Sequence, residues 1–202
     1  TGTAEWLETT GVAVQEALFG PGGELFFVGI DDAEPDVVKL FGISYGGTLV
    51  AVAESGRGMQ SPFFAHGGEM LVFEAGGEGV VVQEIGVNRS TILGTDGTPV
   101  RSGDGEVIGV LGNEAGVGRL ILLDLRAEPL RPVEVAELPF RVSTSTTGAC
   151  SSCPRQGGLA LSHDGRRAVV QGMPREDWEL FLVQVPEGSE EAEVVQLTRE
   201  IQ

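Results

Sequence analysis

The sequence has few basic residues. Its 13 lysines and arginines stand against 30 aspartates and glutamates, which gives a formal net charge of −17. The acidic residues are spread along the whole chain and form no single tail. Binding to a phosphate backbone depends on clusters of lysine and arginine. The composition therefore argues against a nucleic-acid partner.

Long hydrophobic runs and helical periodicity are also missing. No apolar run reaches the roughly 18 residues of a membrane span, and the first residues lack the charged and apolar regions of a signal peptide. What recurs are short apolar or β-branched runs bounded by glycine, aspartate, asparagine and proline, with 31 glycines in all. Such runs are typical of β-strands joined by tight turns. With 41% hydrophobic residues the chain can bury a core, so we expect an all-β fold.

An internal repeat organises these strands. Each unit is a short strand, a turn ending in glycine and a longer apolar strand, and the turn glycines are Gly23, Gly68, Gly105 and Gly165. Their spacings are 45, 37 and 60 residues, against about 40 to 45 for a propeller blade. The predicted strands are 15–19, 24–30, 36–43 and 48–54; 61–65, 69–75, 79–86 and 89–94; 98–102, 106–112, 119–126 and 132–139; 158–162, 166–172, 178–185 and 193–199.

This pattern predicts one β-propeller domain over residues 1–202, a segment of about four four-stranded antiparallel blades. The blades span about 15–56, 61–95, 98–140 and 158–200, and residues 141–157 form an inserted loop. Residues 4–9, "AEWLET", read as a leftover fourth strand of a preceding blade. We therefore expect exposed apolar faces at the ends of the segment, and a larger ring that further blades or another propeller chain would complete.

The last repeat carries a family resemblance. It reads "LALSHDGRRAVV" at 159–170, "WELFLV" at 178–183 and "VQLT" at 195–198. This resembles the repeat of the TolB-like, WD40-like propellers, with His163 where that family has proline. The earlier repeats keep only the glycine and the apolar frame. The resemblance implies a larger ring and a non-enzymatic binding or scaffold module in an extracytoplasmic assembly, in the periplasm, at the cell surface or secreted.

A second motif points to different chemistry. Residues 40–50, "LFGISYGGTLV", contain G-x-S-x-G, the nucleophile elbow of α/β-hydrolases, with Ser44 as the nucleophile. That fold needs more sheet upstream than 43 residues supply, and His163 is the only late histidine for a triad. In the blade register Ser44 lies in a hairpin between the third and fourth strands, which we favour. The alternative is the propeller domain of a larger enzyme, such as a prolyl oligopeptidase-like serine hydrolase.

The two cysteines, Cys150 and Cys153, lie in the inserted loop. They fit a local disulfide that clamps the loop, and two free thiols are the main alternative. A metal or redox role would need further ligands, for which only His66 and His163 are available. No acidic cluster has the spacing of a calcium loop, so we expect no metal and no cofactor.

Acidic side chains gather in the loops between the second and third strands of the blades. Because these loops and the connections between blades share one end of a propeller, the sequence predicts an electronegative rim there, with Arg175 as the one basic residue in these loops. We expect a protein or peptide partner to contact this rim and the cysteine loop; the alternative is that the charge only maintains solubility. The predicted contact residues are Asp31, Asp32, Glu34, Glu78, Glu114, Glu176 and Asp177.

Overall fold

The structure of the chain is a computed structural model that describes residues 9, 11–43, 48–87, 89–94, 97–144, 158–185 and 191–198. These residues form a succession of β-strands and one short 3-10 segment, η1 (His66–Gly68). The all-β prediction is therefore confirmed. In the described part of the chain, no helix has the length and apolar character needed to cross a membrane.

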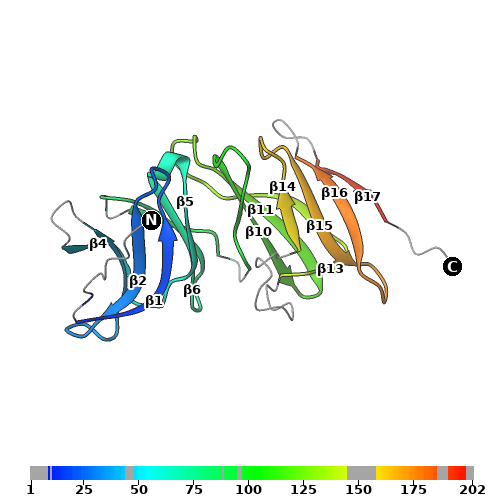
Figure 1. Cartoon of the computed structure of the whole chain (residues 1–202). Helices are drawn as coiled ribbons and strands as arrows, with labels where there is room; N and C mark the ends of the chain where they lie inside the picture. The colour runs from blue at the N-terminus through cyan, green and yellow to red at the C-terminus, as the bar shows by residue number, and fades with distance from the viewer. Residues whose placement is uncertain are drawn as a thin grey trace, which may run out of the picture.

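The strands form four antiparallel sheets, here called blades 1 to 4 (Figure 1). In blades 1 to 3 the strands follow chain order, and in blade 4 both β13 and β14 pair with β15. Blade 1 holds β1 (Val12–Phe19), β2 (Leu25–Asp31), β3 (Val38–Ile43) and β4 (Leu49–Ser55). Blade 2 holds β5 (Gln60–Ala65), β6 (Met70–Ala75), β7 (Gly79–Glu84) and β8 (Arg89–Ile92). Blade 3 holds β9 (Val100–Arg101), β10 (Val107–Glu114), β11 (Val117–Asp124) and β12 (Val133–Leu138). Blade 4 holds β13 (Arg141–Val142), β14 (Leu159–Leu161), β15 (Arg167–Met173), β16 (Glu179–Gln184) and β17 (Glu193–Gln196).

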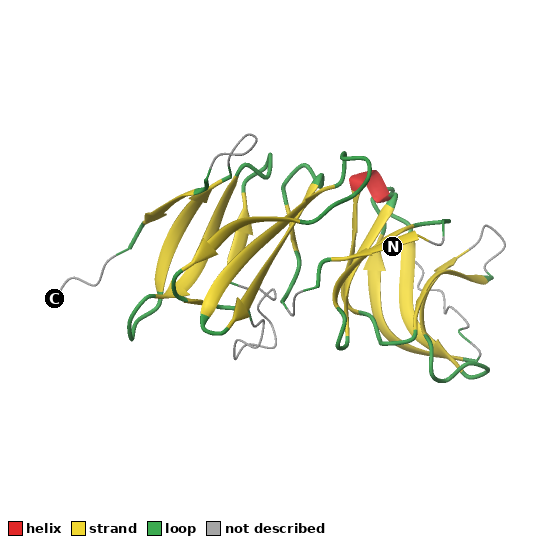
Figure 2. Ribbon diagram, turned by 180° about the vertical axis from the view of Figure 1, so that it is seen from behind, coloured by secondary structure: helices red, strands yellow, loops and turns green. Residues whose placement is uncertain are grey.

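Neighbouring blades pack face to face through buried apolar side chains. One cluster joins blades 1 and 2 and includes Val28, Leu40 and Phe73. A second joins blades 2 and 3, and a third, which includes Leu120 and Phe181, joins blades 3 and 4. Figures 1 and 2 show the blades in a row, with blades 1 and 4 at opposite ends. Among the described residues no buried cluster connects blade 4 back to blade 1, so the four blades form an open segment.

The position of a blade explains its strand sequence. In β10 of blade 3 the run from Val107 to Gly112 is buried, because both faces of the sheet are covered. A strand covered on both sides reads as a continuous apolar run. In β15, the equivalent strand of the end blade 4, buried and less buried positions alternate, and its sequence "RAVVQGM" mixes in polar residues.

The four turn glycines occupy equivalent hairpins, as predicted. Gly23, Gly68, Gly105 and Gly165 all have φ between 71° and 100°, the left-handed region that glycine adopts without steric cost. Successive hairpins also bond to one another: the His66 amide donates to the Gly105 carbonyl at 3.0 Å, and the Asp104 amide donates to the His163 carbonyl at 2.9 Å. The turns therefore lie together at one end of the segment, here called the turn end.

Blades 3 and 4 share a hydrogen-bonded turn built on the sequence Ser-x-Asp-Gly. The Ser102 hydroxyl donates to Asp104 Oδ1 at 2.5 Å and accepts from the Val107 amide at 2.9 Å. In blade 4 the Ser162 hydroxyl donates to Asp164 Oδ1 at 2.6 Å and accepts from the Arg167 amide at 2.9 Å. These serine bonds lower the pKa of both aspartates.

The two serines differ in burial, and this yields a prediction. Ser102 is 1% exposed, whereas Ser162 is partly exposed. Ser102→Ala should lower the free energy of unfolding by about 1–3 kcal/mol, because a buried amide then loses its acceptor. Ser162→Ala should cost less, since water can replace the hydroxyl. Urea unfolding of the two variants measures the difference; equal losses would contradict the role of burial.

The hydrogen bond between Ser102 and Asp104 should make the stability of the fold depend on pH. Because the folded pKa of Asp104 lies below the ordinary value of 3.8, its contribution to stability is present above that value and is lost as the pH falls below it. The stability difference between the wild type and Ser102→Ala should therefore shrink as the pH falls below 3.8. A difference that grows on acidification would show that the serine bond does not favour the ionised aspartate.

The start of the insertion differs from the prediction, because residues 141–142 form strand β13 on blade 4. The side-chain amide of Asn113 holds this strand: it donates to the Val142 carbonyl and its oxygen accepts from the Val142 amide, both at 2.8 Å. The Ser143 amide then donates to the Gln171 carbonyl at 2.9 Å, and the Gly158 amide donates to the Ser143 carbonyl at 3.1 Å. Ser143 and Gly158 thus form a closed stem on which residues 144–157 begin and end.

Candidate functional site: the acidic rim

The loops that join the second and third main strands of each blade lie at the end opposite the turn end. They connect β2 to β3, β6 to β7, β10 to β11 and β15 to β16, and Figure 1 shows them along its lower side. We call this end the acidic rim. It carries the seven predicted contact residues, Asp31, Asp32, Glu34, Glu78, Glu114, Glu176 and Asp177. In an antiparallel sheet with strands in chain order, alternate connections must share an end, which is why the sequence could place them.

Lys39 neutralises part of the rim on blade 1. Lys39 is 9% exposed. Its ammonium group bonds to Glu34 and lies 3.9 Å from Asp31 Oδ2. The hydrogen bond to Glu34 raises the pKa of Lys39, although burial acts in the opposite direction. Asp31 also accepts from the Ala33 amide at 2.9 Å. Two of the predicted contact carboxylates are thus engaged within the blade.

Two arginines neutralise further rim acids on blades 2 and 3. Arg57 Nε lies 2.8 Å from Glu78 Oε1, and Arg119 Nη1 lies 2.9 Å from Glu114 Oε2. Arg57 comes from the connection between blades 1 and 2, and Arg119 from strand β11. The sequence prediction counted cations only in the loops between the second and third strands. It therefore missed Arg57, in the connection between blades, and Lys39 and Arg119, on strands.

A groove of about 380 Å³ opens at the rim between blades 1 and 2. Phe73 and Val81 form apolar parts of its lining, while Glu54 and Glu78 contribute carboxylates. The loops on its two sides are tied by the Gly76 amide, which donates to the Arg57 carbonyl at 2.9 Å. Arg57, which pairs with Glu78, also lines the groove.

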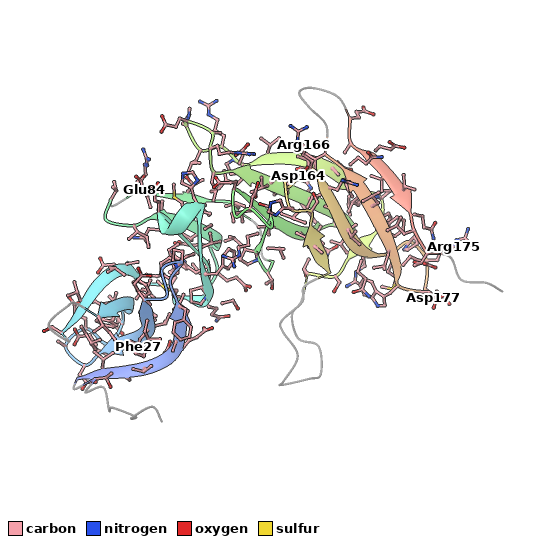
Figure 3. All side chains as sticks on the ribbon, turned by 45° about the horizontal axis from the view of Figure 1, so that its top comes forward. Phe27, Glu84, Asp164, Arg166, Arg175 and Asp177 are labelled. Atoms are coloured by element: carbon pink, nitrogen blue, oxygen red, sulfur yellow. The ribbon has the colours of Figure 1, made fainter. Side chains whose placement is uncertain are left out.

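Three rim carboxylates have no ion pair with a described residue: Asp32, Glu176 and Asp177. All three are exposed. Figure 3 labels Asp177 beside Arg175 at the outer end of blade 4. The negative charge available to a partner is therefore concentrated on the loops of blades 1 and 4.

The turn end carries paired charges and a second groove. Arg126 holds Asp124 through two bonds of 2.8 and 2.9 Å and lowers the pKa of that carboxyl. A second groove, of about 430 Å³, lies here between blades 3 and 4, and its lining includes Arg126, Asp164 and Arg166; Figure 3 labels the last two. His66 Nδ1 lies 2.6 Å from Glu106 Oε2. Within the described ranges no cluster of three or more histidine, cysteine, aspartate or glutamate side chains could hold a metal ion.

The two sequence motifs fall outside the described residues. Ser44 of the G-x-S-x-G motif is one of them, and so are Cys150 and Cys153. The strands that flank Ser44 are described: β3 and β4 pair antiparallel, with Ile43 opposite Leu49. A nucleophile elbow joins a strand to a helix, whereas the next described element here, β4, is a strand. The disulfide between the cysteines stays a prediction.

Comparison with solved structures identifies the fold. No protein-family model and no curated protein matches the sequence. TolB from Acinetobacter baumannii superposes with a TM-score of 0.51 and 13% identity over 93% of this chain and 44% of that one. A TolB-like protein from Agrobacterium tumefaciens gives 0.50 and 12% over 94% of this chain and 63% of the other. The chain therefore has the fold of a TolB-type β-propeller and spans about half the length of these proteins, and the resemblance seen in the last repeat is confirmed at the level of structure.

Proposed function

We propose that this chain is a non-enzymatic binding module of an extracytoplasmic assembly, and that its acidic rim takes a basic segment of a partner protein. One observation carries the proposal: Asp32, Glu176 and Asp177 are exposed carboxylates on the rim without an ion pair to a described residue. These three carboxylates share one end of the segment with loops from every blade.

The charge would act mainly on the rate of encounter. Exposed carboxylates in a chain of net charge −17 attract a cationic partner before contact, and such steering can raise association rates by about 10- to 1,000-fold. The ion pairs of Lys39, Arg57 and Arg119 hold the intervening loops in place. A preorganised rim loses less conformational entropy on binding. The groove between blades 1 and 2 lies at the same rim and is lined by Glu54 and by the Arg57–Glu78 ion pair.

The test compares two triple charge reversals. In the rim variant Asp32, Glu176 and Asp177 become lysine; in the control Glu69, Glu128 and Glu191, which are exposed acids away from the rim, become lysine. The probe is a fluorescent peptide of arginine, glycine and serine, and stopped-flow mixing measures its association rate. At low salt we expect the rim variant to associate about tenfold or more slowly than the wild type, with little change in the control.

Both variants change the net charge by the same amount, so the comparison separates local from total charge. Added salt should reduce the difference between the rim variant and the wild type, because screening acts over about 8 Å at physiological ionic strength. Equal slowing in both variants would mean that only net charge matters. An unchanged association rate in the rim variant would show that these three carboxylates do not attract the peptide.

A further inference from the structure

The face of blade 4 that is turned away from blade 3 carries an apolar row across all its main strands. In the strand register Ala160 lies opposite Val169, Val169 opposite Leu182, and Leu182 opposite Val195. Directly opposite residues share one face of a sheet. Ala168, Val170, Phe181 and Val183, on the alternate positions, are buried against blade 3, so the row faces outward.

The same positions are covered in the blades before it. The pair Val169 and Leu182 corresponds to Val72 and Val82 in blade 2, which lie opposite each other and are 0% and 1% exposed. Both are buried against blade 3. In blade 4 Val195 is 38% exposed, and in the neighbouring row Leu180 and Leu197 are 40% and 51% exposed. Contiguous exposed apolar surface of this kind marks an interaction site.

The outward face of blade 1, at the other end of the segment, also carries an apolar row. Leu18, Phe26 and Val28 of blade 1 pack toward blade 2, so the alternate positions point away from it. These form the row Ala17, Phe27, Phe41 and Ala51. Ala17 and Ala51 are exposed, Phe27 is partly buried and Phe41 is 5% exposed. Figure 3 labels Phe27 on this end blade. Phe19, on the same face, is 73% exposed.

We propose that two copies of this chain associate head to tail, the outward face of blade 4 of each copy packing on the outward face of blade 1 of the other. The junction continues a contact that the chain already makes between each of its successive blades. A contact between two different faces gives either a ring or an open filament. Propellers typically hold about four to eight blades, and two four-bladed copies reach eight, whereas three would exceed that range. A closed ring of two copies is therefore the expected assembly.

Sedimentation velocity on the 202-residue chain tests the assembly. The wild type should sediment as a species of two 21.2 kDa chains. Leu182→Asp on the blade 4 face and Ala51→Asp on the blade 1 face should each sediment as one chain. Val133→Asp is the matched control, because Val133 is 56% exposed on blade 3 and lies outside both faces. It should leave the pair intact.

Mixing the two face variants makes the test specific for a head-to-tail contact. Each variant retains one intact face, so one junction can form between the two different variants, and the mixture should recover a two-chain species although neither variant alone does. Recovery also shows that both variants are folded. A wild type that stays a single chain at all concentrations overturns the proposal. A pair that both variants leave intact, or a mixture that stays monomeric, overturns the assigned faces.

Discussion

Replacing Phe73 with alanine should lower the free energy of unfolding by about 3–5 kcal/mol. Phe73 is the largest side chain among the fully buried ones, with 2% exposure, and it lies in the cluster that joins blades 1 and 2. Its removal deletes apolar contacts and leaves a cavity between two sheets that cannot easily close, because their strands are held by backbone hydrogen bonds. Urea unfolding followed by circular dichroism measures the loss.

Phe63→Ala is the matched control on the same blade. Phe63 is only partly buried at the edge of the cluster between blades 2 and 3, so the same truncation should cost less than half as much. The slope of free energy against urea should stay constant in both variants if the unfolded state is unchanged. A loss below about 1 kcal/mol for Phe73→Ala would contradict the packing between blades 1 and 2.

Phe140→Ala should also lower the free energy of unfolding by about 3–5 kcal/mol, and it should reverse the effect of a second substitution. The Phe140 ring stacks on Phe181 with centroids 4.2 Å apart. A Cβ atom at Gly172 would lie 2.3 Å from Phe140 Cε2. Gly172→Ala alone should therefore destabilise by about 1–3 kcal/mol through overpacking.

In the Phe140→Ala background the clash is gone, and Gly172→Ala should be neutral or stabilising, because glycine in a strand costs about 0.5–1 kcal/mol relative to alanine. A double-mutant cycle by thermal or urea unfolding measures this coupling. Additive effects would mean that Phe140 does not fill the space above Gly172. The cycle tests the packing between blades 3 and 4 independently of the Phe73 result.

The blade order could be predicted from the sequence because turn chemistry is local. A turn that needs positive φ selects glycine, so Gly23, Gly68, Gly105 and Gly165 mark equivalent hairpins without reference to any distant residue. The strands between them have the alternating or continuous apolar patterns that sheet packing requires. Strand β13 was missed because it is two residues long and depends on a side chain of Asn113, which is distant in sequence.

At the rim, too, some features follow from the local sequence and others depend on residues distant in the chain. Connectivity alone places the loops that carry the seven carboxylates at one end. Which of them are neutralised depends on strand register, since Lys39 and Arg119 reach the rim from strands. Counting charges within loops cannot find such partners. The serine of each Ser-x-Asp-Gly turn could have been predicted from the sequence, because Ser102 and Ser162 both lie three residues before the turn glycine.

The stem formed by Ser143 and Gly158 has a consequence for how this chain can change in length. Both residues bond to Gln171 of β15 and to each other, so the chain leaves blade 4 and returns to it at one point. Closing a loop on a fixed stem costs only about 0.6 kcal/mol more for each doubling of its length. Residues can therefore be added or removed between the stem positions with little effect on the blade. During evolution this point can acquire a new segment, and an engineer can graft a reporter domain there, without redesigning the propeller.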